Sequence, residues 1–154
     1  MNDLTQMLRM QEGSGPCRNG RFYAYDDATG LELKPGDTLH GNLTIGYGHN
    51  ITALGLKDVE MLLHEDIADA FDVVHHNFSC YDTLSRPRQL VLLSMAYNLG
   101  PKLSKWVRFI GAVHRGAWDE AAEEILDSAA AQTQAPSRYK ELAVMMRDNT
   151  SQWV

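Results

Sequence analysis

A long helical pattern in the middle of the chain places the strongest constraint on the fold. Between Thr52 and Asn77, apolar residues recur every three or four positions and acidic residues occupy the other faces, which is typical of an amphipathic helix. Short glycine-rich segments precede this pattern, and further helical patterns follow it. We therefore expect a connecting helix over residues 52–78 between a small sheet lobe, residues 13–51, and a helical lobe, residues 79–154.

The sheet lobe is predicted from two strand-like segments and the turn chemistry between them. Arg21 to Asp26 alternates aromatic and small residues, and Asn42 to Gly48 is the next segment of strand character. The sequence Lys34-Pro35-Gly36-Asp37 predicts a turn, because proline fixes φ at the second position and glycine permits a positive φ at the third.

Helix start and stop signals account for the remainder of the chain. Asp3 to Glu12 has apolar residues at helical spacing and ends before Gly13. Ser85 is the expected N-cap of a helix that carries Pro87 in its first turn and stops at Gly100. Three further helices are expected over residues 104–115, 117–131 and 136–149. With residues 1–12 assigned to the helical lobe, the sequence predicts one α+β domain.

Charge and cysteine usage narrow the classes of function. The formal net charge of −6 argues against nucleic acid, which requires a basic face. Local basic clusters such as Lys102, Lys105 and Arg108 are nonetheless suited to guide a polyanionic glycan. No apolar run is long enough to span a bilayer, and the N-terminus lacks the features of a signal peptide. We therefore expect a cytoplasmic protein whose Cys17 and Cys80 are reduced; whether they pair is open.

Two acidic sites and a hydroxyl stand at the ends of predicted elements. Glu12 lies in the last turn of its helix, where the helix dipole disfavours a further negative charge and so favours the protonated carboxyl of a general acid. Asp26 and Asp27 end the first strand, and Thr44 lies in the second. Because adjacent strand residues point to opposite faces, we expect one of the two aspartates to face a cleft. Two such carboxylates suit hydrolysis of a glycosidic bond.

Three motifs in this region carry a resemblance to a known family. They are Met7-Leu8-Arg9 leading into Glu12-Gly13, Tyr25-x-Asp27-x-x-Gly30, and Thr44-Ile45-Gly46-Tyr47-Gly48-His49. The chain resembles the phage-type lysozymes, the endolysins of glycoside hydrolase family 24. The stretches from Glu12 to Asp27 and from Asp27 to Thr44 are longer than the family usually has. Weaker matches follow at Leu93 to Gly100, Trp118 to Ala122, and Pro136 to Arg138.

The resemblance implies a lysozyme-like fold and a role for each matching residue. Glu12 would be the general acid, and Asp27 would be the general base or the carboxylate that stabilises the oxocarbenium-like transition state. The register of the tyrosine motif favours Asp27 over Asp26. Thr44 would help to orient the attacking water. Asn98 would contact the sugar and Arg138 would lie near the catalytic glutamate, although a helix-end amide and a surface arginine are equally ordinary readings. His49 would form a structural pair with Asp66.

The implied activity is hydrolysis of the β-1,4 bond between N-acetylmuramic acid and N-acetylglucosamine in peptidoglycan. Inversion and retention both stay open, because the carboxylate separation is not readable from sequence. The resemblance implies a monomeric endolysin that accumulates in the host cytoplasm and reaches the wall through the lesions of a holin that it does not contact. No cofactor is expected, and no metal either, since His75 and His76 are helix neighbours that cannot face one site. Trp106, Trp118 and Trp153 are expected to pack internally.

Two other functions are compatible with parts of the sequence. A lytic transglycosylase cleaves the same bond without water and needs the glutamate but not the aspartate, so Asp27 and Thr44 argue against it. A non-catalytic wall-binding or virion structural module is a second alternative, because a fold does not fix a function. The presence of Glu12 argues against that module.

Overall fold

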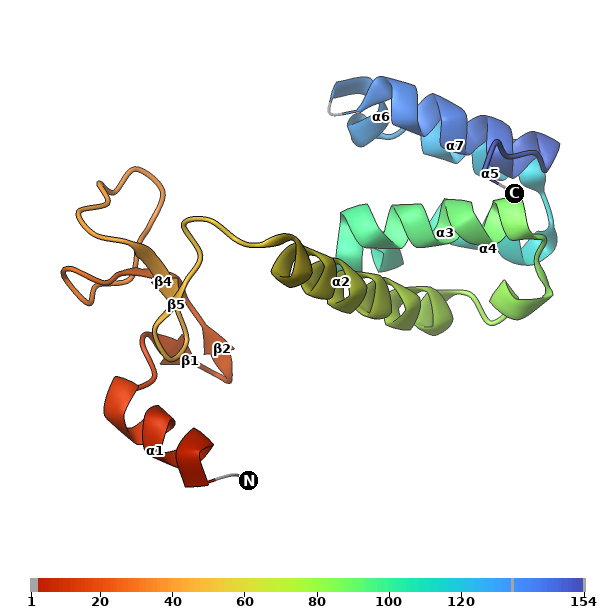
Figure 1. Cartoon of the computed structure of the whole chain (residues 1–154). Helices are drawn as coiled ribbons and strands as arrows, with labels where there is room; N and C mark the ends of the chain where they lie inside the picture. The colour runs from red at the N-terminus through yellow and green to blue at the C-terminus, as the bar shows by residue number, and fades with distance from the viewer. Residues whose placement is uncertain (1–2, 134, 154) are drawn as a thin grey trace. The chain divides into compact units, whose positions relative to one another are not determined.

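The chain forms an α+β fold in which an N-terminal helix is followed by short strands and then by further helices (Figure 1). The computed structural model describes residues 3–133 and 135–153. The chain divides into two compact units, which we call the sheet unit, Met1–Glu60, and the helical unit, Met61–Val154. The α+β class expected from the sequence is thus confirmed. The assignment of residues 1–12 to the helical lobe stays a prediction.

The sheet unit contains two small antiparallel sheets. β1 (Cys17–Arg18) pairs with β2 (Arg21–Phe22), and β3 (Tyr25–Asp26), β4 (Leu43–Ile45) and β5 (His49–Asn50) form a three-stranded sheet with β4 in the centre. In this second sheet Tyr25 lies opposite Thr44, and Thr44 lies opposite Asn50. β4 is hydrogen-bonded to β3 on one side and to β5 on the other, so it joins these two strands into one sheet.

The prediction of one continuous strand from Arg21 to Asp26 is wrong. Arg21–Phe22 and Tyr25–Asp26 are separate strands that belong to different sheets. Between them the chain leaves one partner for another, because the N–H of Tyr23 donates to Pro16 O at 2.9 Å whereas Ala24 O accepts from Leu33 N–H at 3.0 Å. The turn predicted at residues 34–37 is confirmed by the bond from Asp37 N–H to Lys34 O at 3.0 Å.

Polar groups occupy the interior of the sheet unit. Among its described residues, the buried side chains are Asp26, at 2% exposure, and Thr44, at 3%, and both are polar. Every described buried hydrophobic side chain belongs to the helical unit. The sheet unit therefore depends on hydrogen bonds for its internal order to a degree that the helical unit does not.

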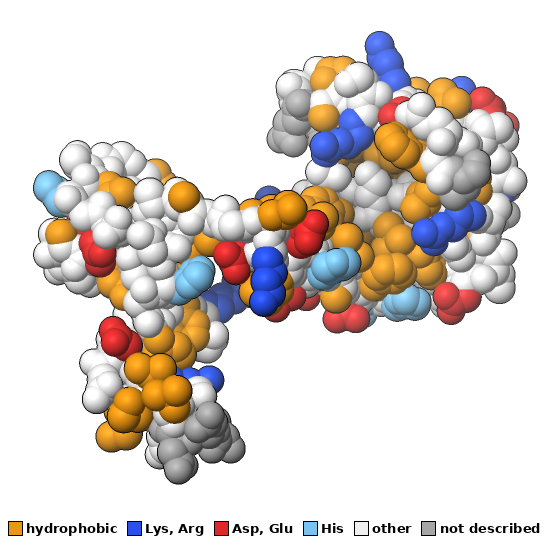
Figure 2. Space-filling model, in the orientation of Figure 1, with side chains coloured by type: hydrophobic (Ala, Val, Ile, Leu, Met, Phe, Trp, Pro, Cys, Tyr) orange, Lys and Arg blue, Asp and Glu red, His pale blue; other side chains and the backbone are white. Residues whose placement is uncertain are grey.

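The N-terminal helix agrees with its prediction. α1 (Asp3–Glu12) ends on Glu12, and Gly13 follows with a φ of 70°, the left-handed conformation that commonly terminates a helix at glycine. Its apolar side chains are exposed, as the orange group at the lower left of Figure 2 shows; they are Leu4, Met7, Leu8 and Met10.

The long helix starts four residues later than the sequence pattern indicates. α2 runs from Leu56 to Asn77, because Thr52 is tied to the sheet: its Oγ1 accepts the N–H of Leu43 at 2.9 Å. The helix begins where Asp58 Oδ2 accepts the N–H of Gly55 at 3.2 Å, which satisfies a backbone donor that the helix start would leave unpaired.

The helical unit contains more and shorter helices than expected. After the single turn η1 (Tyr81–Thr83) come α3 (Arg86–Leu99), η2 (Gly100–Lys105), α4 (Val107–Arg115), α5 (Trp118–Leu126), α6 (Ala129–Thr133) and α7 (Pro136–Asp148). The expected helix over 117–131 is interrupted because the hydroxyl of Ser128 accepts the N–H of Ala131 at 3.0 Å and so starts α6. The expected start at Ser104 is replaced by the 3₁₀ helix η2. Ser85 stands at the start of α3, but its hydroxyl bonds to Asn149 instead of capping the helix.

A continuous hydrophobic core holds the helical unit together. α7 packs against α5, α6 and α3, and Phe78 and Phe109 meet edge to face with ring centroids 5.9 Å apart. Two of the tryptophans pack as expected, Trp106 against Phe109 and Trp118 against the core. Trp153 does not, since it is 69% exposed.

Two further expectations concern membrane-spanning helices and the two cysteines. Among the described helices, none combines the length and the apolar character that crossing a membrane requires. Cys17 and Cys80 are both free thiols in this structure.

Candidate functional site

Glu12 lies at the end of α1, beside the turn that joins β4 to β5. A Cβ atom added to Gly48 would lie 3.6 Å from Glu12 Oε2. The carboxylate is exposed, at the end of the helix where the dipole is negative. This position brings the predicted general acid next to Gly48, in the turn that follows β4.

Asp26 is a buried carboxylate that accepts three backbone hydrogen bonds. Its Oδ2 accepts the N–H of His40 at 2.7 Å, and its Oδ1 accepts the N–H groups of Gly41 at 2.9 Å and Ala28 at 3.0 Å. The His40 N–H is the largest cause that holds the pKa of Asp26 below its usual value, and the imidazole Nδ1 lies 3.3 Å away. Asp26 therefore anchors the end of the loop that leads into β4.

Asp27, in contrast, is exposed and bonds to one residue with both carboxylate oxygens. Its Oδ1 accepts the N–H of Asn42 at 2.6 Å and its Oδ2 accepts the side-chain Nδ2 of Asn42 at 2.9 Å. The side-chain donor is the largest cause that lowers the pKa of Asp27, followed by the backbone donor, while the charge of Asp26 opposes them. The result is an accessible carboxylate that is stabilised in its ionised form.

The expectation that the two aspartates point to opposite faces is wrong in detail. β3 ends at Asp26, and Asp27 opens the following turn, so strand alternation does not extend to Asp27. Both carboxylates reach the same segment, residues 40–42, whose three successive N–H groups they accept. The two residues differ in burial, not in the segment that they bind.

Gly41 is the point of closest approach in this arrangement. A Cβ atom at this position would lie 2.1 Å from Asp27 Oδ1 and 2.9 Å from the N of Ala28. These separations are far below van der Waals contact, so any side chain at residue 41 would displace the Asp27 carboxylate. Glycine at residue 41 is thus a condition for the observed position of Asp27.

Thr44 is buried in the central strand β4, opposite Tyr25. Its hydroxyl donates to the carbonyl oxygen of Asn42 at 3.3 Å. The hydroxyl oxygen retains its acceptor capacity, since a threonine hydroxyl has one proton and two lone pairs. Thr44 and Asp27 are thereby linked through the same residue, Asn42.

Asn98, expected to contact the sugar, and Arg138, expected to lie near the catalytic glutamate, lie together in the helical unit. Asn98, near the end of α3, accepts a hydrogen bond from the guanidinium of Arg138 in the first turn of α7. The Asn98 Nδ2 donates to Ser94 O at 2.6 Å. Both side chains are exposed. The alternatives of an ordinary helix-end amide for Asn98 and an ordinary surface arginine for Arg138 therefore also agree with the structure.

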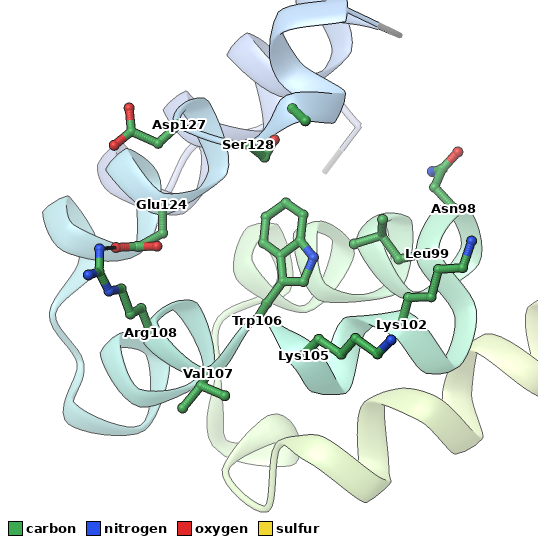
Figure 3. Close-up of a pocket in the computed structure, with 11 residues that line it drawn as sticks. Asn98, Leu99, Lys102, Lys105, Trp106, Val107, Arg108, Glu124, Asp127 and Ser128 are labelled. Atoms are coloured by element: carbon green, nitrogen blue, oxygen red, sulfur yellow. Dashed lines mark ion pairs between the residues drawn. The ribbon is translucent and has the colours of Figure 1, made fainter.

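A cavity of about 680 Å³ opens beside Asn98 (Figure 3). Trp106 stands in its centre, and Lys102 and Lys105 extend along its edge from η2. Arg108, on the other side of the indole, pairs with Glu124 at 3.7 Å. The cavity thus combines an aromatic surface with cationic side chains and with two acidic ones, Glu124 and Asp127.

The expected pair of His49 and Asp66 is divided between the two units. His49 lies in β5 of the sheet unit and Asp66 in α2 of the helical unit, and both are exposed. Their pairing stays a prediction. Within residues 3–133 and 135–153, no three side chains of His, Cys, Asp or Glu are grouped so as to hold a metal ion.

Sequence reasoning missed Asn42, His40 and Gly41. Asn42 was taken as the start of a strand, and nothing in a single asparagine indicates that it binds a carboxylate fifteen positions earlier. Gly41 did carry a usable signal, since glycine is the default residue where the backbone approaches another group closely.

Comparison with protein families gives one match. The family model described as phage lysozyme matches residues 26–138, which include Asp27, Thr44, Asn98 and Arg138 and leave Glu12 outside. Comparison with curated proteins gives no significant match. This family comprises glycosidase-type enzymes that act on the peptidoglycan of the cell wall. Because the match covers most of the chain and both units, the chain belongs to the phage lysozyme family.

Proposed function

We propose that the protein is an endolysin that hydrolyses the β-1,4 bond between N-acetylmuramic acid and N-acetylglucosamine. The single observation that carries this proposal is the contrast between the two aspartates. Both are stabilised in their ionised form by hydrogen bonds, but Asp26 is buried, whereas Asp27 is exposed. An accessible carboxylate and a glutamate that acts as an acid are the two groups that glycoside hydrolysis requires.

Each residue then has a defined step. Glu12 donates its proton to the glycosidic oxygen as the bond to the leaving sugar breaks. Asp27 accepts a proton from the attacking water, or stabilises the positive charge at the anomeric carbon. Thr44 supplies an acceptor that orients the water.

The helical unit supplies contacts for the substrate. Asn98 and Arg138 form one polar group at the ends of α3 and α7, and the cavity beside Asn98 presents Trp106, Lys102 and Lys105. A sugar face stacks on an aromatic ring, and ammonium groups attract the carboxylates of peptidoglycan stem peptides. We infer that this surface holds the glycan strand and its peptides.

The biological setting follows from the same proposal. The enzyme acts as a monomer, accumulates in the host cytoplasm and reaches the wall when a holin opens the inner membrane, which leads to lysis of the host. A lytic transglycosylase is the alternative to consider, because it acts on the same bond. It has no use for a second carboxylate, and the bidentate support of Asp27 by Asn42 favours the hydrolase.

The test is a turbidity assay on outer-membrane-permeabilised cells with wild type and Glu12→Gln. The amide keeps the size of the side chain but has no proton to donate as an acid, so lysis is expected to fall by at least about a hundredfold. The variant is expected to keep its melting temperature, because removing a negative charge from a helix C-terminus is mildly stabilising. Lysis at the wild-type rate by Glu12→Gln would overturn the proposed mechanism.

A further inference from the structure

Asn42 connects two of the proposed catalytic residues through four hydrogen bonds. Its N–H and its Nδ2 donate to Asp27 Oδ1 and Oδ2 at 2.6 and 2.9 Å. Its carbonyl oxygen accepts the N–H of Asp27 at 3.1 Å and the hydroxyl of Thr44 at 3.3 Å. One residue therefore contacts both the carboxylate and the hydroxyl that the reaction uses.

The geometry at Asp27 restricts its carboxylate to one orientation. Both oxygens accept hydrogen bonds from Asn42, and Gly41 lies against Oδ1 on the side where a Cβ would stand only 2.1 Å away. An exposed aspartate without such contacts rotates freely about its side-chain bonds. A fixed reacting group lowers the entropic part of the barrier, since a small misplacement costs a large factor in rate.

We propose that Asn42 is a positioning residue of the hydrolysis, whose side-chain amide orients the carboxylate of Asp27 and whose carbonyl couples it to the hydroxyl of Thr44. The proposal rests on the proposed function, in which Asp27 acts in its ionised form. Among the residues that the structure describes, the hydrogen-bond partner of the Asn42 Nδ2 is Asp27. The side-chain amide is therefore dedicated to this carboxylate.

The charged groups around Asp27 provide a way to distinguish a positioning role of Asn42 from a purely structural role. Asp26, the adjacent carboxylate, raises the pKa of Asp27, and the donors of Asn42 lower it. His40, from the segment packed against both aspartates, contacts Asp26. Loss of the Asn42 amide therefore leaves Asp27 harder to ionise, a change that a purely structural defect does not produce.

The experiment compares Asn42→Ala and Asn42→Asp with wild type in the pH dependence of kcat/KM on soluble, uncrosslinked peptidoglycan. Asn42→Ala removes the side-chain donor and keeps the backbone bonds. Asn42→Asp has the same shape but replaces the donor by an acceptor that carries a like charge. Asn50→Ala is the matched control, because Asn50 lies in the neighbouring strand β5 and its side chain accepts the N–H of Thr52, at 2.8 Å.

We expect the acid limb of Asn42→Ala to move to higher pH by about half a unit, and that of Asn42→Asp to move further in the same direction. The kcat of Asn42→Ala at neutral pH is expected to fall by about tenfold with KM nearly unchanged, the pattern of an interaction that acts in the transition state. The alkaline limb, which reports the general acid, stays in place for both variants. Asn50→Ala keeps both limbs.

Melting curves show whether each variant is folded at the assay temperature, and Asn42→Asp serves if Asn42→Ala is not. An unmoved acid limb in a folded variant would overturn the role of Asn42. Asp27→Asn in the same assay separates this from the underlying proposal. If Asp27→Asn is inactive and Asn42→Ala is unshifted, only the role of Asn42 fails; if Asp27→Asn is fully active, the proposed function fails as well.

Discussion

Two adjacent aspartates, Asp26 and Asp27, have the same charge and different surroundings. Asp26 is 2% exposed and accepts N–H groups from His40, Gly41 and Ala28. Asp27 is exposed and bonds to Asn42. Burial suits an anchor, whereas exposure suits a group that receives a proton from water. These surroundings lead to opposite expectations for the two charge-removing substitutions.

Asp27→Asn is expected to lower kcat by about a hundredfold or more, the usual contribution of a positioned acid or base. Asp26→Asn, assayed where it is folded, is expected to stay within about tenfold of wild type, because its charge acts on the reaction only through the field. The rate of peptidoglycan solubilisation by the two variants checks this. Equal losses at both positions would contradict the separate roles of the two carboxylates.

The sheet unit depends on the segment that follows the long loop after β3. Residues 40–42 return the chain to β4, and their three N–H groups are accepted by the two aspartates. The buried side chains among the described residues of this unit are Asp26 and Thr44, both polar. A unit ordered in this way is expected to lose stability when its carboxylates are protonated, whereas the hydrophobic core of the helical unit is less sensitive.

The pH dependence of stability follows from the lowered pKa of Asp26. Its contribution is fully present above the unfolded-state pKa, about 3.9, and is lost as pH falls through the lower folded-state value. Asp26→Asn is expected to lower the melting temperature of the sheet unit near neutral pH by about 5 °C or more. The difference from wild type shrinks in strong acid. Asp72→Asn, an exposed position in α2, is the control and shows no such difference at any pH.

The sequence predicted helices better than strands for a physical reason. The end of α1 at Gly13 depends on local chemistry, and it appears where expected. The break between Phe22 and Tyr25 depends on which distant segment each pair of residues meets, and no local pattern contains that information. The same holds for the proposed site: Glu12, Asp27 and Thr44 are predicted from their motifs, whereas Asn42 contacts Asp27 from fifteen positions away.

At the scale of the whole molecule, an acidic protein has a cavity lined by more cationic than acidic side chains. The net charge is −6, yet the cavity around Trp106 is edged by Lys102 and Lys105. The two lysines are three residues apart in the 3₁₀ helix η2, where side chains at that spacing lie above one another. The local field near a binding surface has more influence on an approaching polyanion than the total charge does.

Removing both charges with Lys102→Ala and Lys105→Ala is expected to raise KM for peptidoglycan by several-fold, about the effect of 1 kcal/mol. The rate of the double variant is also expected to respond less to added salt than that of wild type, because fewer screened charges remain. Steady-state assays over a salt series measure both effects. The matched control is Lys57→Ala, at an exposed position at the start of α2. An equal effect of this substitution would contradict a specific role of the two lysines at the cavity.

The central claim, that Glu12 and Asp27 add water across the muramic acid bond, is tested most directly by the products. Peptidoglycan digested in water enriched in the heavy oxygen isotope is reduced with borohydride and examined by mass spectrometry. We predict that each new reducing end is N-acetylmuramic acid with one heavy oxygen atom, since water is the co-reactant of the hydrolysis. Unlabelled anhydro ends that resist reduction, or new ends on N-acetylglucosamine, would contradict it.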